Sequence, residues 1–352
     1  MVGGVVRTAD GSSFASGAGA VTSIGIDIVD PQLQASIAGI LADVEAELRD
    51  SVFSADPFVT EAARHLVEAG GKRFRPLLVA LGAHFGDPAA PLVVPAAVVM
   101  ELTHLATLYH DDVMDEAPVR RGAPSANSRW TNSVAILVGD YLFARAADLA
   151  ADLGIEAVRL QARTFARLVH GQIAETVGPH GGEPSVDHYL QVIGDKTGSL
   201  IATSARFGGM FGGAPAEHVE ALAGYGETIG VAFQLSDDLL DIASDSAQSG
   251  KTPGTDLREG VHTLPVLYAL GSDDGDAASR RLREILAAGP VTDDDLHAEA
   301  LGLLRESPAL KRARETVRGY AEEARSRLAP LPPGPARQAM QSLCDFIADR
   351  TN

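Results

Sequence analysis

Residues 105–122 read LATLYHDDVMDEAPVRRG, and this stretch determines how the rest of the chain is interpreted. An apolar run with helical spacing leads into it, so we expect a helix over residues 91–117 that stops at Pro118. Asp111 and Asp115 are four residues apart and therefore lie on one face of that helix. Carboxylates are disfavoured at a helix C-terminus, where the macrodipole is already negative, unless a cation binds there. The stretch therefore predicts a cation site.

The same spacing of acidic residues occurs a second time, in FQLSDDLLD at residues 233–241. Here Asp237, Asp238 and Asp241 lie toward the end of a long helix predicted over residues 216–245. One such cluster has an ordinary interpretation as a solvated helix end. Two copies in apolar helices, more than a hundred residues apart, argue against that interpretation. Two facing sets of hard oxygen ligands suit Mg²⁺, which binds carboxylates, water and substrate phosphates.

Composition limits the classes of protein that fit. The chain of 352 residues carries a formal net charge of −18, which argues against non-specific binding to nucleic acid. Its single cysteine, Cys344, rules out an internal disulfide and fits a reducing cytoplasm. The N-terminus lacks the continuous apolar core of a signal peptide, and the most apolar window, residues 91–100, is too short to span a bilayer. A cytoplasmic location is therefore expected.

The periodicity of apolar residues predicts an all-α fold, a single-domain helical bundle with a central apolar cavity. Residues 1–23 are rich in glycine, alanine and serine without periodicity, which predicts a disordered N-terminal extension before one domain at residues 24–352. No stretch alternates with period two over a sustained length, so no sheet is predicted. The other helices are expected at residues 30–52, 57–69, 133–152, 156–178, 185–212, 262–270, 277–288, 292–306, 308–329 and 335–350, with one more opening at Pro76.

Several basic residues could accompany the acidic clusters. The run Lys72-Arg73-Phe74-Arg75 comes just before a predicted helix start, where backbone N–H groups attract phosphate, although an exposed basic turn is an equally good interpretation. His104 precedes Asp111 by seven residues and shares its face about 10 Å lower, where a lone histidine is usually a satisfied core residue. Lys196 has apolar neighbours on both sides, which makes it a candidate inward-facing cation.

The polar loop at residues 244–260 follows the second acidic cluster. Gly250-Lys251-Thr252 resembles the end of a phosphate-binding P-loop, but Asp245 stands where that motif requires glycine, and no strand is predicted before it. The loop is better interpreted as a mobile flap that carries Lys251 over a cavity. Metal ions and cations around a diphosphate would favour ionisation of a carbon–oxygen bond, and an apolar helical interior would protect the resulting carbocation from water.

Six motifs in order give the chain a family resemblance. They are GGKRFRP at 70–76, ELTHLATLYHDDVMDEAPVRRG at 101–122, GDYLFARA at 139–146, KTG at 196–198, FQLSDDLLD at 233–241 and GKTPGTDLREGVHTLP at 250–265. Over about residues 30–350 the chain resembles the trans-isoprenyl diphosphate synthases of the polyprenyl synthetase family. One departure is Gly198, where many relatives carry alanine, and this is expected to loosen that helix slightly.

The resemblance implies an all-α fold of the isoprenyl synthase type and the head-to-tail condensation of isopentenyl diphosphate with an allylic diphosphate. It assigns the isopentenyl diphosphate head to Lys72, Arg75, His104 and Arg121. It assigns the allylic diphosphate to Arg120, Lys196 and Lys251. It assigns Mg²⁺ to Asp111, Asp115 and Asp237, with help through metal-bound water from Asp112, Asp238 and Asp241. It assigns catalytic roles to Lys196, Thr197 and Gln234, of which Thr197 and Gln234 place dipoles near the developing cation.

Product length is expected to depend on the helix below the first acidic cluster. Relatives that stop at short products tend to place an aromatic ring there, whereas this chain has the small residues Ala106 and Thr107. A long-chain polyprenyl product is therefore expected, with geranylgeranyl diphosphate as the alternative if Phe143 or Phe165 forms a deeper floor.

Two rival classes share some of these features. A terpene cyclase normally needs only one DDxxD motif and no second diphosphate site, so the residues Lys72, Arg75 and His104 argue against it. A non-catalytic partner subunit of another synthase usually loses its acidic clusters, and both are intact in this chain. Family analogy further implies a homodimer, and at most peripheral membrane contact for product release.

Overall fold

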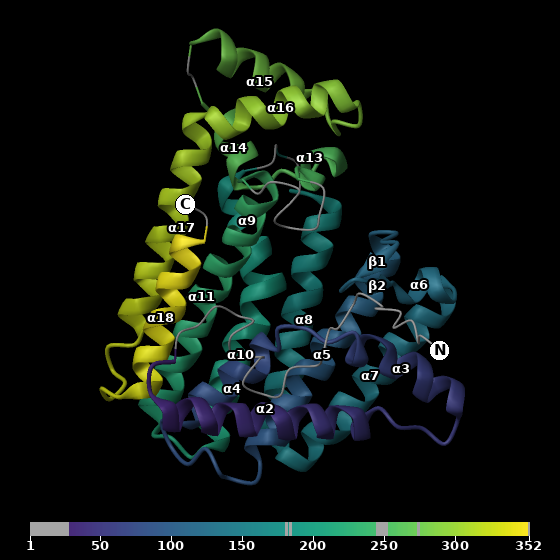
Figure 1. Cartoon of the computed structure of the whole chain (residues 1–352), viewed down its shortest axis with the longest axis vertical. Coiled ribbons are helices and arrows are strands. Elements are labelled where there is room, and N and C mark those ends of the chain that lie inside the picture. Colours follow the sequence, from purple (N-terminus) through teal and green to yellow (C-terminus); the bar gives the residue numbers. More distant parts are fainter. Residues whose placement is uncertain (1–27, 180–181, 183–184, 244–252, 273–274, 351–352) are drawn as a thin grey trace, which may run out of the picture.

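Helix α5 (Val93–Met114) lies at the centre of the structure and carries the first acidic cluster at its end. It is buried on nearly all sides, as expected for a helix whose apolar residues are not confined to one face. Its neighbours are α2 (Pro31–Ser51), α4 (Phe74–Ala83), α7 (Asn132–Leu153) and α10 (Ser199–Phe211). In Figure 1 α2 runs across the lower part of the bundle.

The computed structural model describes residues 28–179, 182, 185–243, 253–272 and 275–350. The predicted disordered extension at residues 1–23 lies outside the described residues. The same holds for Lys251 and for residues 244–252 of the predicted flap. From α2 to α18 (Pro335–Asp349), the described helices contribute to one continuous cluster of buried apolar side chains. No described helix is long and apolar enough to cross a membrane.

Helix α11 (Ala216–Ala243) is the second central helix and carries the second acidic cluster. It packs against α10 on one side and against α17 (Pro308–Arg327) on the other. Helix α11 also lies very close to the segment at residues 194–198. A Cβ atom at Gly230 of α11 would lie only 2.8 Å from the Cα atom of Gly198. A glycine pair therefore allows α11 to approach the segment that carries Lys196 and Thr197.

Side-chain caps explain why most predicted helix starts are accurate. Asp30, Thr131 and Ser307 each accept a hydrogen bond from a backbone N–H group in the first turn of the following helix. Proline stands in the first turn of several helices, where its missing N–H group has no cost. The remaining helices are α3 (Pro57–Glu68), α6 (Ala126–Arg129), α8 (Ile155–Val177), α13 (Thr255–Glu259), α14 (Leu264–Leu270), α15 (Ala277–Ala287) and α16 (Asp294–Glu306).

The helix predicted at residues 185–212 contains an irregularity that the sequence does not announce. It consists of α9 (Val186–Ile193), a π-helical turn (Gly194–Gly198) and then α10. π-helical turns inside α-helices are rare and often mark functional sites. Here the turn carries Lys196 and Thr197.

The prediction that the chain has no sheet is wrong at one place. Strands β1 (Val119–Arg120) and β2 (Ala123–Pro124) pair in an antiparallel hairpin directly after α5. Arg121 and Gly122 between them both have positive φ angles, of 54° and 77°, as a type I′ turn requires. Strands of two residues are too short to show alternation, so periodicity could not reveal them.

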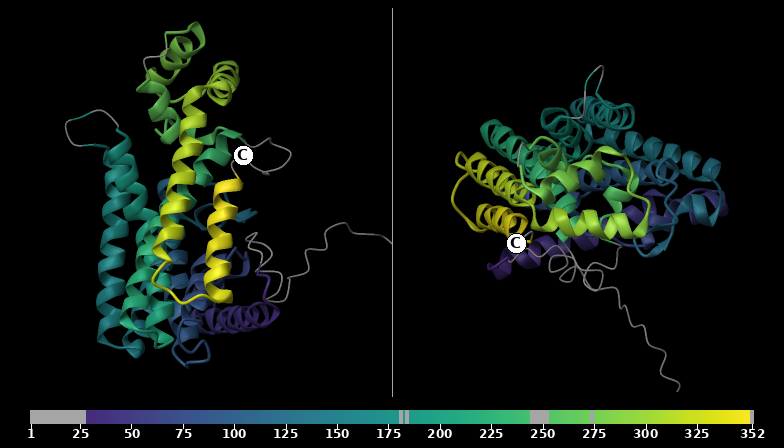
Figure 2. Two further views of the ribbon diagram at one scale, coloured as in Figure 1. Left: turned by 90° about the vertical axis from the view of Figure 1, so that its left-hand side faces the viewer. Right: turned by 90° about the horizontal axis from the view of Figure 1, so that it is seen from above.

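Helices α15 and α16 pack against each other at the end of the molecule that lies beyond α14 and α13 (Figures 1 and 2). Figure 2 shows that this pair projects past the parallel helices of the bundle. Helix α17 then returns along α11 and is followed by α18, which brings the C-terminal part of the chain back toward the acidic cluster of α11.

Candidate active site

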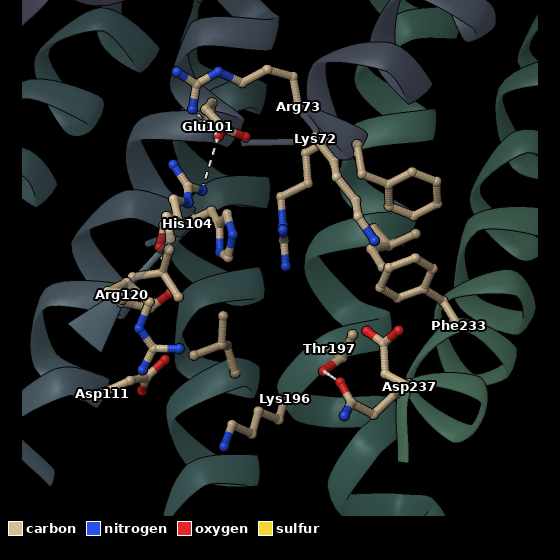
Figure 3. Close-up of a pocket in the computed structure, with 18 of the residues that line it drawn as sticks. Lys72, Arg73, Glu101, His104, Asp111, Arg120, Lys196, Thr197, Phe233 and Asp237 are labelled. Atoms are coloured by element: carbon tan, nitrogen blue, oxygen red, sulfur yellow. Dashed lines mark hydrogen bonds and ion pairs between the residues drawn. The ribbon is translucent and has the colours of Figure 1, made fainter. Parts of the chain in front are cut away.

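A cavity of about 390 Å³ lies between the ends of α5 and α11. Its walls come from the start of α4, from α5, from the hairpin, from α8, from the π-helical turn and from α11. Most of the predicted site residues line it: Lys72, Arg75, His104, Thr107, Asp111, Arg120, Arg121, Lys196, Thr197, Gln234 and Asp237. In Figure 3 Asp111 and Asp237 approach this cavity from opposite sides. The structure therefore brings the two acidic clusters to one cavity.

The three aspartates of the first cluster occupy different environments. Asp111 lines the cavity, and burial raises its pKa to about 6, with the negative charge of Asp115 acting in the same direction. Asp115 ends the helix and is exposed. Asp112 is fully buried and accepts a hydrogen bond from Nε of Arg120. Asp112 thus holds the arginine that lines the cavity, while its Oδ2 atom has no hydrogen-bond partner among the described residues, and its contact with metal-bound water stays a prediction.

The second cluster divides in a similar way. The Asp237 side chain is 41% exposed, and its Oδ1 atom lies 2.8 Å from Nη2 of Arg350, which follows α18. Asp241 accepts hydrogen bonds from the backbone N–H groups of Thr255 and Asp256, both at 3.2 Å, and so anchors the start of α13. Asp241 therefore has a structural role in this region, and its expected contact with metal-bound water stays a prediction.

Asp238 is buried and belongs to a chain of hydrogen bonds. Its Oδ1 atom accepts a bond of 2.9 Å from Nε2 of Gln234, and its Oδ2 atom accepts one from the Tyr189 hydroxyl. The Oε1 atom of Gln234 accepts a bond of 3.1 Å from Oγ1 of Thr197. Burial raises the pKa of Asp238 to about 6, against the opposing effect of the bonds from Tyr189 and Gln234.

Arg73 lies within the predicted basic run but turns away from its neighbours. It has a left-handed backbone conformation, with φ of 50°, at the start of α4. Its side chain is buried and forms ion pairs with Glu45 of α2 and, at 3.0 Å, with Glu101 of α5. Arg121 also approaches Glu101, at 3.7 Å, and donates to the backbone oxygen of Leu66 at 3.0 Å. Buried Glu101 therefore ties two arginines together.

Arg75 and His104 face the same cavity, and in the described part of the chain few hydrogen bonds or opposite charges offset their burial. The Nε atom of Arg75 is buried and has no hydrogen-bond partner among the described residues. Burial lowers the pKa of Arg75 to about 10, although the charge of Glu101 opposes this. Burial also lowers the pKa of His104 well below its usual value, and the charges of Arg75 and Arg121 add to the effect. A cation with an unpaired donor beside a buried neutral imidazole, both with perturbed pKa values, is typical of a functional site and suits an anion.

Lys196 reaches the cavity from the π-helical turn and forms an ion pair with Glu175 of α8. Figure 3 shows its amino group directed toward the side of the cavity that holds Asp111. The inward orientation predicted from its apolar neighbours is consistent with this position.

A second, more apolar cavity of about 340 Å³ adjoins the first one. Thr107, Asp111, Leu168 and Gln172 line both cavities. The rings of Phe143 and Phe165 also line the second cavity, with their centres 4.2 Å apart. Of the two small residues predicted to set chain length, Thr107 therefore faces the cavities. The other, Ala106, is fully buried and does not belong to the lining of either described cavity.

The donor set fits a hard divalent cation. Carboxylate oxygens of Asp111 and Asp237 reach one cavity from opposite walls, and Asp115 lies next to Asp111 on the same helix face. Within the described part of the chain, no three His, Cys, Asp or Glu side chains are gathered into one preformed group. Mg²⁺ is commonly held by one or two carboxylates together with substrate phosphates and water, so a divided set of this kind suits it.

Sequence reasoning missed four residues that shape this site: Arg73, Glu101, Tyr189 and Arg350. Glu101 and Arg350 have no local signal, because their partners lie far away in the chain. Arg73 had a signal, its place in a basic run, but the direction of its side chain depends on a left-handed backbone angle. Tyr189 lies seven residues before Lys196, and only the fold brings it to Asp238.

Comparisons with known proteins agree with this geometry. The family model described as Polyprenyl synthetase matches residues 56–303. A nonaprenyl diphosphate synthase of Mycobacterium tuberculosis is 52% identical over 93% of this chain and 97% of its own length.

Two solved structures share the fold. The geranylgeranyl pyrophosphate synthase from Corynebacterium glutamicum, complexed with calcium and isoprenyl diphosphate, has a TM-score of 0.83 and 45% identity, covering 93% of this chain and 99% of its own. A decaprenyl diphosphate synthase from Rhodobacter capsulatus has a TM-score of 0.82 and 37% identity, covering 91% and 99%.

Proposed function

The chain belongs to the polyprenyl synthetase family and is a trans-prenyltransferase, and we propose that it makes a long-chain polyprenyl diphosphate. In the cavity, isopentenyl diphosphate would be joined head to tail with an allylic diphosphate. The observation that carries this proposal is the cavity itself. Acidic residues reach it from two opposite helices, cations line the rest of its wall, and an apolar cavity continues from it past Thr107.

The cations and the neutral His104 divide into two groups, which fit two diphosphate heads. Lys72, Arg75, His104 and Arg121 come from the start of α4, from α5 and from the hairpin, and they would bind isopentenyl diphosphate. Neutral His104 would act as a hydrogen-bond donor, and an incoming diphosphate would raise its pKa again. Arg75 has an unused donor for the same anion.

The allylic diphosphate would lie nearer the acidic residues. Asp111, Asp115 and Asp237 would hold Mg²⁺, and Arg120, Lys196 and Lys251 would bind the diphosphate directly. The calcium and isoprenyl diphosphate in the C. glutamicum relative support a divalent ion beside such a substrate. Bound Mg²⁺ supplies positive charge that stabilises the departing diphosphate. Arg120 is held for its task by buried Asp112, and Lys196 by Glu175.

The bond changes follow from this arrangement. The allylic carbon–oxygen bond breaks and the diphosphate leaves with the electron pair. The double bond of isopentenyl diphosphate then attacks the carbocation, and the product loses a proton to the released diphosphate. Oxygen dipoles of Thr197 and Gln234, both lining the cavity, would stabilise the positive charge, with Lys196 at the departing group.

A long-chain product is supported by the apolar cavity and by the relatives. The small side chain of Thr107 stands where the two cavities meet, so a growing chain can pass from the first into the second. The nonaprenyl and decaprenyl diphosphate synthases are named for long products. The alternative, geranylgeranyl diphosphate, has a named relative as well, and the Phe143–Phe165 pair would be its floor.

We further propose a homodimer that uses the outer face of α7 and α8. These two helices contact each other, and Ile136, Leu137, Ile173 and Val177 are exposed on them. Ile136 and Ile173 also line the apolar cavity, so a second copy on this face would cover the open side of the cavity. Light scattering should give twice the mass of one chain, and Leu137→Glu should give single chains.

The central test uses purified protein with Mg²⁺, labelled isopentenyl diphosphate and farnesyl diphosphate, followed by chromatography of the dephosphorylated products. Products longer than geranylgeraniol support the proposal in full. Accumulation of geranylgeraniol supports the alternative chain length. Absence of any extended product, or full activity in Asp111→Asn, would contradict the assignment of the site.

A further inference from the structure

Four side chains form an uninterrupted hydrogen-bonded chain that leads from the cavity wall into the protein. Thr197 donates to Oε1 of Gln234 at 3.1 Å, and Nε2 of Gln234 donates to Oδ1 of Asp238 at 2.9 Å. The Tyr189 hydroxyl donates to the other oxygen of Asp238. The dashed line at Thr197 in Figure 3 marks the first of these bonds. The chain connects α9, the π-helical turn and α11.

The members of this chain differ in their access to the cavity. Thr197 and Gln234 belong to its lining. Asp238 is only 9% exposed, and of the four described side chains neither it nor Tyr189 is part of that lining. Tyr189 is therefore linked to the cavity wall by hydrogen bonds through Asp238 and Gln234.

The chemistry of the partners fixes the direction of the Gln234 amide. An ionised carboxylate can only accept hydrogen bonds, so the NH₂ group of Gln234 must face Asp238. The carbonyl oxygen then points the other way, toward Thr197, and accepts the hydrogen of its hydroxyl. In the reversed orientation, the positive end of the amide dipole would face Thr197 and the cavity.

We propose that Tyr189 and Asp238 are positioning residues, which hold the Gln234 amide so that oxygen dipoles rather than amide hydrogens face the positive charge that develops during condensation. This rests on the proposed function, because the direction of the amide matters only if a cation forms in the cavity. Preorganised dipoles of this kind stabilise a transition state without reorganisation at the moment of reaction. Asp238 is thereby separated in role from its neighbour Asp237, which lines the cavity.

Removal of one hydroxyl group tests the proposal. In Tyr189→Phe, Asp238 loses one of its two partners and the amide is held less firmly. We expect the single-turnover rate constant of the first condensation to fall about tenfold. The KM for isopentenyl diphosphate and the half-saturating Mg²⁺ concentration should stay within about twofold of wild type. A matched control is Tyr225→Phe, which removes another buried hydroxyl, bonded at 2.9 Å to the backbone oxygen of Met340 outside the cavity.

A double-mutant cycle shows whether the effect passes through Gln234. In a Gln234→Leu background there is no amide to hold, so Tyr189→Phe should change the rate constant by less than about twofold. An equal tenfold loss in both backgrounds would overturn the proposal, because Tyr189 would then act independently of Gln234.

Variants that remove the charge of Asp238 show whether this residue positions Gln234 or contributes to metal binding. Asp238→Asn keeps an oxygen for Gln234 and offers an NH₂ group to the Tyr189 oxygen, so the rate should fall no more than about threefold. Asp238→Ala interrupts the series of hydrogen bonds, so its rate constant should be as low as that of Tyr189→Phe or lower. An increase of about tenfold in the half-saturating Mg²⁺ concentration of Asp238→Asn would overturn the proposal in favour of a metal-linked role.

Turnover by the wild-type protein distinguishes a failure of the proposed function from a failure of the positioning role alone. If wild-type protein does not extend an allylic diphosphate, the proposed function fails and this inference fails with it. If wild type turns over normally but the cycle is additive, the inference alone is overturned. Circular dichroism and thermal melting of each variant confirm that the compared proteins are folded.

Discussion

The guanidinium group of Arg350 lies 2.8 Å from Oδ1 of Asp237, so an arginine near residue 352 contacts a carboxylate of the proposed metal-binding set. The Arg350 side chain is only 9% exposed. It donates to Oγ of Ser236 at 2.6 Å and to the backbone oxygen of Phe233 at 2.9 Å, and it stacks on the Phe233 ring. These contacts hold the arginine in place. A cation bound by Asp237 must therefore tolerate a fixed positive charge nearby.

Removal of this charge should strengthen metal binding. In Arg350→Met the stem of the side chain is kept and the guanidinium group is lost, so repulsion of Mg²⁺ falls. We expect the half-saturating Mg²⁺ concentration to fall several-fold and the melting temperature to fall as well, because hydrogen bonds to α11 are lost. Initial rates measured against Mg²⁺ concentration check this. Arg325→Met, which breaks a bond to Asp345 on α18, is the control. A higher Mg²⁺ requirement would show that Arg350 orients Asp237 rather than opposing the metal.

Loss of the Glu101 carboxylate should be among the most damaging changes outside direct substrate contact. The side chain is 1% exposed and serves both Arg73 and Arg121, so Glu101→Leu leaves two guanidinium groups without their shared anion. We expect a loss of about 3–5 kcal/mol in the free energy of unfolding, measured by urea denaturation. Glu45→Leu removes the more exposed partner of Arg73 and should cost distinctly less. Equal losses would contradict this account.

His104 should contribute to the pH dependence of stability. Burial lowers its pKa in the folded protein, whereas the unfolded chain keeps a value near 6.5. Its contribution is therefore complete above about pH 6.5 and is lost as the pH falls toward the folded pKa, by up to about 1.4 kcal/mol per pH unit. His104→Asn should make the unfolding free energy decline less between about pH 7 and pH 5. Exposed His170 on α8 supplies the control His170→Asn. An unchanged slope in His104→Asn would contradict the prediction.

Chain length should respond to Thr107 more cleanly than to Ala106. Thr107→Phe places a ring where the two cavities meet, so the main product should become shorter while the melting temperature stays close to wild type. Ala106→Phe instead forces a ring into a fully buried position, because the Ala106 backbone oxygen lies within 3.2 Å of where a Cβ atom at Gly139 would stand. Overpacking should cost about 1–3 kcal/mol. Product chromatography and thermal melting check both variants, and a normal product ladder in Thr107→Phe would place the floor elsewhere.

The sequence predicts those parts of the site that leave a signal within a short stretch of the chain. Asp111 and Asp237 break the preference of helix ends, and that conflict marked them without any knowledge of the fold. The helices followed from the period of their apolar residues, and the structure shows that local caps such as Asp30 fix where they start. These signals depend on neighbours within about one turn.

The rest depends on contacts that distant segments create. Asp112 and Asp238 are indistinguishable in sequence from the residues beside them, yet one is tied to Arg120 and the other to Tyr189. The position of Arg73 and Arg75 in one basic run did not show which of them forms buried ion pairs. Arg73 has a left-handed backbone angle, and its side chain pairs with Glu45 and Glu101, which lie far away in the sequence.

The π-helical turn at residues 194–198 has a consequence for how this polypeptide can vary. Removing one residue there would let the flanking α-helices fuse into a regular helix, and everything on one side would rotate by about 100°. Lys196 and Thr197 could then no longer both line the cavity, as they do now. Length changes are therefore excluded from these five residues, although a substitution can be absorbed. A single in-frame codon deletion in this short span should inactivate the enzyme while leaving a folded helix behind.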